Sequence, residues 1–475
     1  MQRRGIFGLK IWFVDTYRGG EREWPSRKEK LVNLPAMSRR EFVRLGASAV
    51  VAANVALLEP LAQASGSDAG EKIRFVSIGT GIRGCDLLRA ARQVTNGVCV
   101  GAADLYEMRH QTAKEALGGE IPTTSDYRRL LDRKDVDAVL IATSDHLHRR
   151  VTLDALAAGK DVYCEKPMSH SVADGFAMVD AVQQGKRIFQ AGSQRVSSVL
   201  YAKARQIYLS GRLGEVHSID AKWNRNSPGG AWTYPVPADA SEKNVDWASF
   251  IQDAPPRPFD PVRFFRWRLF ADYGSGLGGD LFVHLLSGIQ AITGMNTVAS
   301  RAYSSGGLYH YKDGRDFPDQ LETIYDYPEM QIHLHCNQNN ADGGEGIGFY
   351  GSKGTMVLTG QTVTFTPEDV RPQFEGYGWN GMTEAQRKQG MKDWRKAHPD
   401  PPSAPDTAET YTLPRGYNDT ADHLTNFFKA VKSRQHVVED EVFGNNAAIG
   451  CHLANYSYFH RTIANWDAAT RTIKA

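Results

Sequence analysis

Ile73-Arg-Phe-Val-Ser-Ile78 is a short run rich in β-branched residues that leads directly into Gly79-Thr-Gly81-Ile-Arg-Gly84. Cys85–Arg92 then has the pattern of an amphipathic helix. After a strand, the first glycine permits a tight turn, the second lets the backbone approach a pyrophosphate, and the third allows close packing. The helix N-terminus would meet the phosphates. The alternative is that the glycine-rich turn only connects the strand to the helix and binds no ligand. The expected cofactor-binding residues here are Gly79, Thr80, Gly81, Ile82, Arg83 and Gly84.

Val98–Ala103 is the next expected strand, and Asp104 follows it. An acid about 20 residues after the glycines can accept hydrogen bonds from the adenosine ribose hydroxyls and would repel a 2′-phosphate. We therefore expect NAD as the cofactor. Two alternatives stay open, because Asp104 would also serve as a helix N-cap and because Arg109 nearby would suit NADP.

Strands and helices alternate in the following segment. Asp137–Ala142 and Asp161–Cys164 read as buried strands, with a helix expected over Val151–Ala158 between them. Polar residues follow each strand, as Thr143-Ser-Asp-His-Leu-His148 and as Glu165-Lys166-Pro167. This alternation, with polar residues at the strand ends, predicts a doubly wound parallel sheet.

These motifs, in this order, resemble those of the Gfo/Idh/MocA oxidoreductases, which include inositol dehydrogenases and glucose–fructose oxidoreductase. The resemblance continues through Gly192-Ser-Gln194-Arg195, Gly278-Gly-Asp280-Leu-Phe-Val-His284 and the turn Gly351-Ser-Lys-Gly354. It implies an α/β protein with an N-terminal Rossmann domain. It also implies a C-terminal α/β domain whose open, largely antiparallel sheet often builds oligomers.

The resemblance further implies which residues meet the ligands. Lys166, Asp280 and His284 would carry the chemistry. Aromatic faces stack on sugar C–H surfaces and fixed polar groups pair with hydroxyls. Besides the glycine-rich turn, the expected cofactor-binding residues are Asp104, Arg109, Thr143, Ser144, His146, His148, Glu165, Lys166 and Gln194. The expected substrate-binding residues are Arg195, Asn224, Tyr234, Trp267, Arg268 and Tyr273.

The chemistry of the three catalytic candidates agrees with these roles. Lys166 at a strand end would project into the ligand crevice, and Asp280 and His284 share one face of a helix. We expect His284 to take the hydroxyl proton as hydride leaves for the nicotinamide. Lys166 would stabilise charge on the oxygen, and Asp280 would hold the substrate or tune the imidazole. Each residue also has a structural alternative: Lys166 as a solvated turn lysine, Asp280 as a helix cap and His284 as a core histidine. The family often has an aspartate where this chain has Ser287.

The N-terminal segment resembles a twin-arginine signal. Ser38-Arg39-Arg40-Glu41-Phe42 precedes a small, apolar run over Leu45–Leu58, and Ala62-Gln-Ala64 supplies a cleavage pattern. About fourteen apolar residues are fewer than the roughly twenty that span a bilayer. We expect export by the twin-arginine machinery to the periplasm or exterior, with no membrane span after processing. An exported enzyme would carry its NAD tightly bound.

Composition excludes other classes of protein. The first 64 residues hold 11 of the 56 basic and 6 of the 54 acidic residues, so the remainder carries a formal charge of −3. This near-neutral body argues against a nucleic-acid partner. Five scattered cysteines lack the spacing of a metal site, and we expect buried thiols and no metal. They are Cys85, Cys99, Cys164, Cys336 and Cys451.

The expected organisation is a leader, signal and linker over residues 1–71, a Rossmann domain over 72–192, and the second domain over 193–475. Residues 366–414 are rich in Pro, Gly, Gln and charge, which predicts an insertion. Helices are expected in the last part, 417–475.

We therefore expect an exported, homo-oligomeric NAD(H)-dependent oxidoreductase acting on a hydroxyl carbon of a sugar, glycoside or polyol. An NAD-dependent glycoside hydrolase, which oxidises transiently, eliminates and re-reduces, is the second reading. Such hydrolases lack the lysine of the Glu165-Lys166-Pro167 turn. A non-catalytic sugar-binding module is the third reading.

Overall fold

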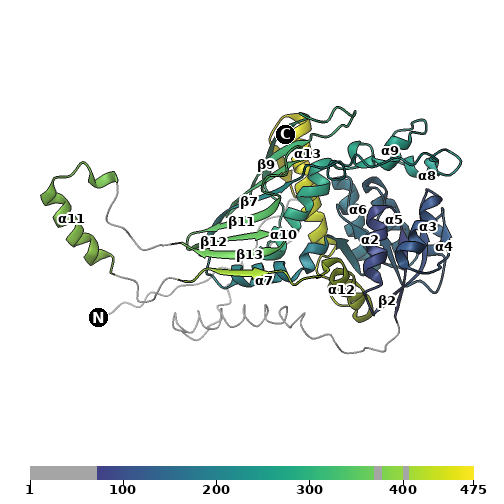
Figure 1. Ribbon diagram of the computed structural model, residues 1–475, viewed down its shortest axis with the longest axis horizontal. Coiled ribbons are helices and arrows are strands. Elements are labelled where there is room, and N and C mark those ends of the chain that lie inside the picture. The colour runs from purple at the N-terminus through teal and green to yellow at the C-terminus, as the bar shows by residue number, and fades with distance from the viewer. Residues whose placement is uncertain (1–71, 369–376, 400–405) are drawn as a thin grey trace, which may run out of the picture. The chain divides into compact units, whose positions relative to one another are not determined.

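The computed structural model describes residues 72–368, 377–399 and 406–475 (Figure 1). The expected leader, twin-arginine motif and linker, residues 1–71, lie outside the described residues. So do two short stretches of the expected insertion, residues 369–376 and 400–405.

β1 (Ile73–Ile78) lies inside a six-stranded parallel sheet of order β3-β2-β1-β4-β5-β6. Helices cover both faces of such a sheet, so its strands read as continuous apolar runs. The doubly wound sheet predicted from the sequence is confirmed. The other strands are β2 (Gly97–Ala103), β3 (Thr123–Thr124), β4 (Ala138–Ile141), β5 (Asp161–Glu165) and β6 (Phe189–Gly192). The helices are α2 (Ile82–Ala91), α3 (Met108–Leu117), α4 (Arg128–Leu131), α5 (Asp145–Ala157) and α6 (Val172–Gly185).

α5 begins earlier than the expected start at Val151. Ser144 has an extended backbone and Asp145 occupies the first turn of the helix. A carboxylate is favourable there, because the helix dipole is positive at its N-terminus. The helix therefore starts at the edge of the sheet, directly behind the end of β4.

The second sheet has ten strands in the order β14-β13-β12-β11-β7-β10-β9-β8-β15-β16. β7 and β10 run parallel and the other described pairs are antiparallel, which confirms the expected open, largely antiparallel sheet. Its strands are β7 (Val216–Asn224), β8 (Arg301–Gly307), β9 (Gln320–Asp326), β10 (Gln331–Asn337), β11 (Glu345–Gly351), β12 (Gly354–Thr359), β13 (Thr362–Pro367), β14 (Glu409–Thr412), β15 (Ala464–Asp467) and β16 (Thr472–Lys474). The helices and short helical turns of this half are η1 (Gln194–Ser197), α7 (Val199–Leu209), α8 (Trp247–Ile251), α9 (Pro261–Phe265), η2 (Trp267–Leu269), η3 (Gly278–Phe282), α10 (Val283–Thr293), η4 (Tyr377–Trp379), α11 (Glu384–Ala397), α12 (Asp419–Ser433) and α13 (Glu441–His460).

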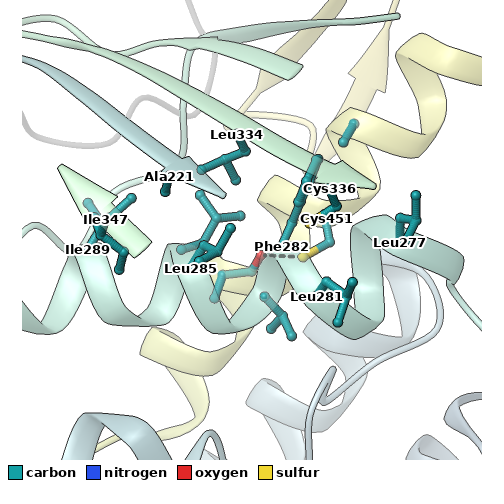
Figure 2. Close-up of a cluster of buried hydrophobic side chains, with 14 of the residues drawn as sticks. Ala221, Leu277, Leu281, Phe282, Leu285, Ile289, Leu334, Cys336, Ile347 and Cys451 are labelled. Atoms are coloured by element: carbon teal, nitrogen blue, oxygen red, sulfur yellow. Dashed lines mark hydrogen bonds between the residues drawn. The ribbon is translucent and has the colours of Figure 1, made fainter. Parts of the chain in front are cut away.

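η3 is a π-helical turn that continues into α10, so the segment that carries Asp280 and His284 is not a regular α-helix. Phe282, Leu285 and Ile289 of this segment are buried against one face of the second sheet (Figure 2). Burying each such side chain contributes about 1.5–3 kcal/mol. The sheet side of this contact includes Ala221, Leu334, Cys336 and Ile347 (Figure 2). This packing fixes the register of the helix, and with it the two polar side chains.

α12 packs on the parallel sheet, although the sequence assigned it to the second domain. The Phe428 ring stacks on Phe75 of β1, with ring centroids 5.1 Å apart. Leu424 and Phe427 lie in the same buried cluster. α13 also reaches that half through Ala448. Residues after 417 therefore complete the core around the parallel sheet.

The expected insertion, 366–414, was too long at both ends. β13 continues to Pro367, and β14 pairs antiparallel with it from Glu409 onward. β14 forms because Thr-Tyr-Thr favours an extended chain and because Arg212, from a distant part of the chain, binds Glu409. The C-terminal segment was also expected to be helical, but its end forms β15 and β16 on the opposite edge of the sheet.

Candidate active site

One cleft of about 490 Å³ runs along the carboxyl ends of β1, β2, β4 and β5 and continues to η3 and α10. It covers the point between β1 and β4 where the strand order reverses, which is where doubly wound sheets bind ligands. The expected residues that line it are Gly79, Gly81, Ile82, Arg83, Asp104, Arg109, Thr143, Ser144, Glu165, Lys166, Gln194, Tyr234, Trp267, Arg268, Asp280 and His284. Those that do not line it are Thr80, Gly84, His146, His148, Arg195, Asn224 and Tyr273.

The glycine-rich turn has the geometry that a dinucleotide needs. Gly79 has φ +83°, and a Cβ there would lie 2.6 Å from the Ala142 carbonyl oxygen. A Cβ on Gly84 would lie 2.0 Å from the Gly79 carbonyl oxygen, so this glycine is required for packing. A Cβ on Gly81 would meet only the Arg109 guanidinium, at an ordinary 3.5 Å. Gly81 is therefore free of packing constraints and leaves the backbone open to the cleft.

Asp104 is buried at the end of β2 and holds the turn in place. Its carboxylate accepts hydrogen bonds from the Thr80 N–H at 2.7 Å and from the Tyr106 N–H at 3.0 Å. Arg109 Nη1 lies 3.4 Å from the same carboxylate. Asp104 thus both lines the cleft and caps a loop. The Arg109 guanidinium packs over the rings of Tyr106, Phe264 and Phe265.

Arg83 projects from the start of α2 into a network of polar side chains. Its Nε donates to Glu165 Oε1 at 2.6 Å, and its Nη2 donates to Gln194 Oε1 at 3.3 Å. Burial alone would lower the pKa of Arg83, but the Glu165 carboxylate raises it above its ordinary value. Glu165 and Gln194 therefore orient a permanent positive charge beside the turn.

The two histidines of the Thr143–His148 motif support the site from behind. His146 Nε2 lies 2.7 Å from the Phe250 carbonyl oxygen, and burial lowers its pKa to about 4. His148 Nδ1 lies 2.8 Å from the Pro167 carbonyl oxygen. Both rings thus satisfy main-chain carbonyls, and His148 fixes the turn that carries Lys166.

Lys166 and Asp280 form an ion pair in the cleft. Lys166 Nζ donates to Asp280 Oδ1 at 2.8 Å and to the Asp280 carbonyl at 2.9 Å. Arg268 Nε donates to Oδ1 at 3.2 Å, and Trp232 Nε1 donates to Oδ2 at 3.0 Å. Burial alone would raise the pKa of Asp280, but Lys166 and Arg268 hold it well below its ordinary value. Asp280 is a charged anchor for Lys166.

His284 lies beside this pair, in surroundings that favour its neutral form. Burial lowers its pKa well below 6.5, and the charges of Lys166 and Arg195 lower it further. Its Nδ1 is buried and has no hydrogen-bond partner among the described residues. Ser287, at the position where the family often has an aspartate, instead donates to Glu439 Oε1 at 3.1 Å. The imidazole is therefore positioned by packing, including a contact with Trp223 at 5.0 Å between ring centroids.

The remaining substrate candidates divide into two groups. Tyr234, Trp267 and Arg268 line the same cleft as Asp280, and Arg268 binds it. The other three make structural contacts elsewhere. These are the Arg195–Glu345 ion pair, the Asn224 hydrogen bond to the Asp342 carbonyl, and the packing of Tyr273 on His146.

Among the other residues that line the cleft, three interact with Asp280 or contribute to its charged surroundings: Asp145, Arg225 and Trp232. Burial raises the pKa of Asp145 to about 6. Trp232 has φ +63°, which is rare for a large side chain, and such outliers gather at functional sites. Asp145 belongs to the Thr143–His148 motif, whereas Arg225 and Trp232 belong to no motif recognised in the sequence. Their spacing gave no signal, because distant strands and loops bring them to the cleft.

The strained turn before Trp232 is held by buried side chains. Arg315 Nη2 donates to the Ala231 carbonyl at 3.1 Å, and Gln338 Nε2 donates to the Gly230 carbonyl at 3.1 Å. These bonds orient the indole N–H toward Asp280.

Residues 73–193 match a protein-family model described as GFO_IDH_MocA, an oxidoreductase family with an NAD-binding Rossmann fold. This segment is similar to a Gfo/Idh/MocA NAD-binding domain. It includes the glycine-rich turn, Asp104 and the Lys166 turn, so the family suggested by those motifs is confirmed for this part of the chain.

Sequence relatives include inositol 2-dehydrogenases. The enzyme of Salmonella paratyphi B is 35% identical over 140 residues, which cover 29% of this chain and 42% of that protein. The enzyme of Pseudarthrobacter chlorophenolicus is 30% identical over 197 residues, which cover 41% of this chain and 54% of that protein. The chain thus spans about half the length of these relatives.

Solved structures share the two-part fold. Levoglucosan dehydrogenase in complex with NADH and levoglucosan has a TM-score of 0.59 at 17% identity, covering 83% of this chain and 99% of that one. An NAD binding oxidoreductase from Klebsiella pneumoniae gives the same values. The Gfo/Idh/MocA domain is therefore followed by a second domain of the same architecture as in these proteins.

All five cysteines are free and buried, as expected. Among the described residues, no three or more His, Cys, Asp or Glu side chains are grouped to hold a metal ion. Within the same ranges, no helix has the length and apolarity to cross a membrane.

Proposed function

We propose that the protein is an NAD(H)-dependent dehydrogenase acting on a CH–OH group of a sugar, glycoside or polyol. The observation that carries the proposal is that one cleft joins the glycine-rich turn to Lys166, Asp280 and His284. The inositol 2-dehydrogenase relatives and the levoglucosan dehydrogenase fold support this substrate class.

The residues of the cleft fit NAD. Gly79 and Gly84 shape the turn, Gly81 leaves its backbone open, and the N-terminus of α2 would face the phosphates. Asp104 would accept from the adenosine ribose and disfavour a 2′-phosphate. Bound NAD would supply the hydride acceptor.

The chain's own residues would handle the proton and the charge. Neutral His284 accepts the proton of the substrate hydroxyl. The Lys166 ammonium lies where negative charge builds on that oxygen, and a preorganised positive group is most effective there. Asp280 accepts hydrogen bonds on both oxygens, so it positions Lys166 rather than the substrate.

The test is the absorbance of the purified protein before and after adding candidate sugars and inositols, with and without NAD. We expect NADH to form with one class of polyol. Reduction without added NAD would show that the cofactor is retained, as we propose for an exported enzyme. Release of the aglycone from a glycoside without net NADH would contradict the dehydrogenase proposal and favour the glycoside hydrolase.

We also propose twin-arginine export to the periplasm or exterior, on the basis of the motif around Arg39 and Arg40. N-terminal sequencing of the exported protein should begin near Ser65. An Arg39→Lys, Arg40→Lys variant should accumulate inside the cell, and a mature protein that keeps both arginines would contradict the proposal.

Homo-oligomers are proposed from the second sheet. Side chains along its strands point alternately into the core and outward. The outward face carries exposed apolar side chains, which a second copy of the chain would cover. They include Tyr303, Ile324, Tyr350 and Val357. Light scattering of the purified protein tests this, and a monomer at all concentrations would contradict it.

A further inference from the structure

Arg225 stands where β7 ends and lines the cleft beside the catalytic candidates. Its guanidinium lies over the Trp223 ring, 5.2 Å from the centroid. In the part of the chain that the structure describes, this guanidinium makes no hydrogen bond and no ion pair. An unpaired charge in a cleft is costly unless a ligand compensates it.

The side chain of Arg225 is held in place before any ligand arrives. A Cβ on Gly230 would lie 3.1 Å from Arg225 Cβ and 3.2 Å from its Cδ, so the aliphatic stem runs along that glycine. The main-chain N–H of Arg225 donates to the Asn337 carbonyl at 2.8 Å. A preorganised guanidinium loses little freedom on binding, and its planar fork matches a carboxylate or phosphate.

The other positive charges nearby are already paired. Lys166 and Arg268 share the single carboxylate of Asp280, and Arg195 pairs with Glu345. Lys166, Arg268 and Arg225 thus face Asp280 with an excess of two positive charges. With Asp145 counted as ionised, one positive charge still remains.

The excess charge is on the substrate side of the cleft. Arg225 belongs to the second domain, and its charge acts on both Asp280 and His284. The phosphates of a dinucleotide would instead meet the turn at Gly79–Gly84, beside Arg83. The carboxylates of Asp280 and Glu345 act on Arg225 through space, but neither forms an ion pair with it, so a neutral sugar would leave its guanidinium without a hydrogen-bonded anion.

We propose that the substrate is an anionic sugar whose carboxylate or phosphate is bound by Arg225. This inference rests on the proposed dehydrogenase function and names its substrate class. Hydrogen bonds to charged groups are worth enough to give about a 10- to 100-fold preference for the acid over its neutral counterpart.

The test compares D-glucuronate with D-glucose, D-galacturonate with D-galactose, and D-glucose 6-phosphate with D-glucose, using the full chain with NAD. We expect kcat/KM for one anionic class to exceed that of its neutral partner about 10-fold or more. Arg225→Gln should remove this preference, lowering kcat/KM for the anionic sugar at least about 10-fold more than for its neutral partner and leaving the Kd for NADH unchanged. The anionic class with the higher kcat/KM, uronates or sugar phosphates, identifies the anion that Arg225 binds.

Lys222→Gln is the matched control, because Lys222 is an exposed cation of the same strand, outside the cleft. It should leave the preference intact. Equal or better use of the neutral sugars by the wild type, or an equal loss for both classes in Arg225→Gln, would overturn the inference.

Failure of the two proposals can be distinguished. If no sugar is oxidised, the dehydrogenase proposal fails, and calorimetry of glucuronate, glucose 6-phosphate and glucose on the NADH complex still decides the anion site. Anion binding that Arg225→Gln abolishes supports it. Anion binding no tighter than that of glucose in the wild type overturns it.

Discussion

Lys166 Nζ binds both the side chain and the main chain of Asp280, at 2.8 and 2.9 Å. Lys166 follows β5 of the nucleotide-binding half, and Asp280 lies in the π-helical turn of the other half. One ammonium therefore fixes the distance between the NAD-binding edge and the residues proposed to meet the substrate. Because Asp280 also holds Arg268 and Trp232, loss of Lys166 would leave its carboxylate in place but remove the positive group proposed to face the reacting oxygen.

Lys166→Ala should lower kcat by about 10²–10⁴ while the Kd for NADH changes little, because Lys166 does not contact the glycine-rich turn. Stopped-flow turnover and fluorescence titration of NADH measure both quantities. Lys388→Ala, on exposed helix α11, is the control and should behave as wild type. Near-normal turnover of Lys166→Ala would make the lysine structural.

His284 should remain neutral, and so able to accept a proton, well below pH 6.5. Burial and the charges of Lys166 and Arg195 depress its pKa, so the neutral form persists as the pH falls. The acidic limb of kcat/KM due to this group should therefore lie below pH 6.5. His284→Ala should reduce turnover about 10²–10⁴-fold and lose this limb. A wild-type limb centred above pH 6.5 that vanishes in His284→Ala would contradict the neutral assignment.

Alanine substitutions at two glycines of the same turn should affect two different properties, the stability of the fold and the affinity for NADH. Gly84→Ala places a Cβ 2.0 Å from the Gly79 carbonyl oxygen and should destabilise the fold by about 1–3 kcal/mol. Gly81→Ala meets ordinary contacts and should keep the melting temperature, but weaken NADH binding by obstructing the approach of the pyrophosphate. Thermal melts and NADH titrations distinguish them. Wild-type NADH affinity in Gly81→Ala would place the dinucleotide elsewhere.

Asp104→Asn should narrow the preference for NAD over NADP. The amide oxygen can still accept one main-chain N–H, whereas the repulsion of a 2′-phosphate is lost and Arg109 remains. Each tenfold change in relative Kd corresponds to about 1.4 kcal/mol. Paired titrations with NADH and NADPH give the ratio. Tighter binding of NADPH by the wild type would show that Arg109 outweighs the carboxylate.

Glu439 should make stability fall as the pH rises through neutrality. Burial raises its pKa to about 8, so the folded protein keeps a proton that the unfolded chain, with a pKa near 4.5, releases. Between these values the folded state binds more protons, and raising the pH costs up to about 1.4 kcal/mol per unit from this group. Glu439→Gln should therefore lose less stability than wild type between pH 5 and 8, in chemical denaturation at each pH. Parallel curves for the two proteins would contradict the assignment.

The strand–turn–helix start was predictable because its rules are local. Gly79 needs a positive φ and Gly84 needs the absence of a side chain, and both requirements follow from a turn between adjacent elements. The turn that carries Lys166 follows a buried strand for the same reason.

The rest of the cleft could not be predicted from spacing. Trp232 reaches Asp280 because Arg315 and Gln338, from later segments, hold its turn. Arg225 enters the cleft from a strand whose neighbours in the sheet come more than a hundred residues later. The role of Asp280 as an anchor for Lys166 depends on hydrogen bonds across two domains, which no local pattern encodes.

The packing of α12 on the parallel sheet has a consequence for biosynthesis. Asn96 donates to the carbonyl of Thr425, 329 residues further along the chain, and Phe428 covers Phe75. Domains generally fold N-terminal first while the ribosome is still working. Here, however, the nucleotide-binding domain leaves one apolar face open until α12 has been synthesised. Its final folding step must wait for α12, and a nascent chain halted before residue 419 would present that face to chaperones.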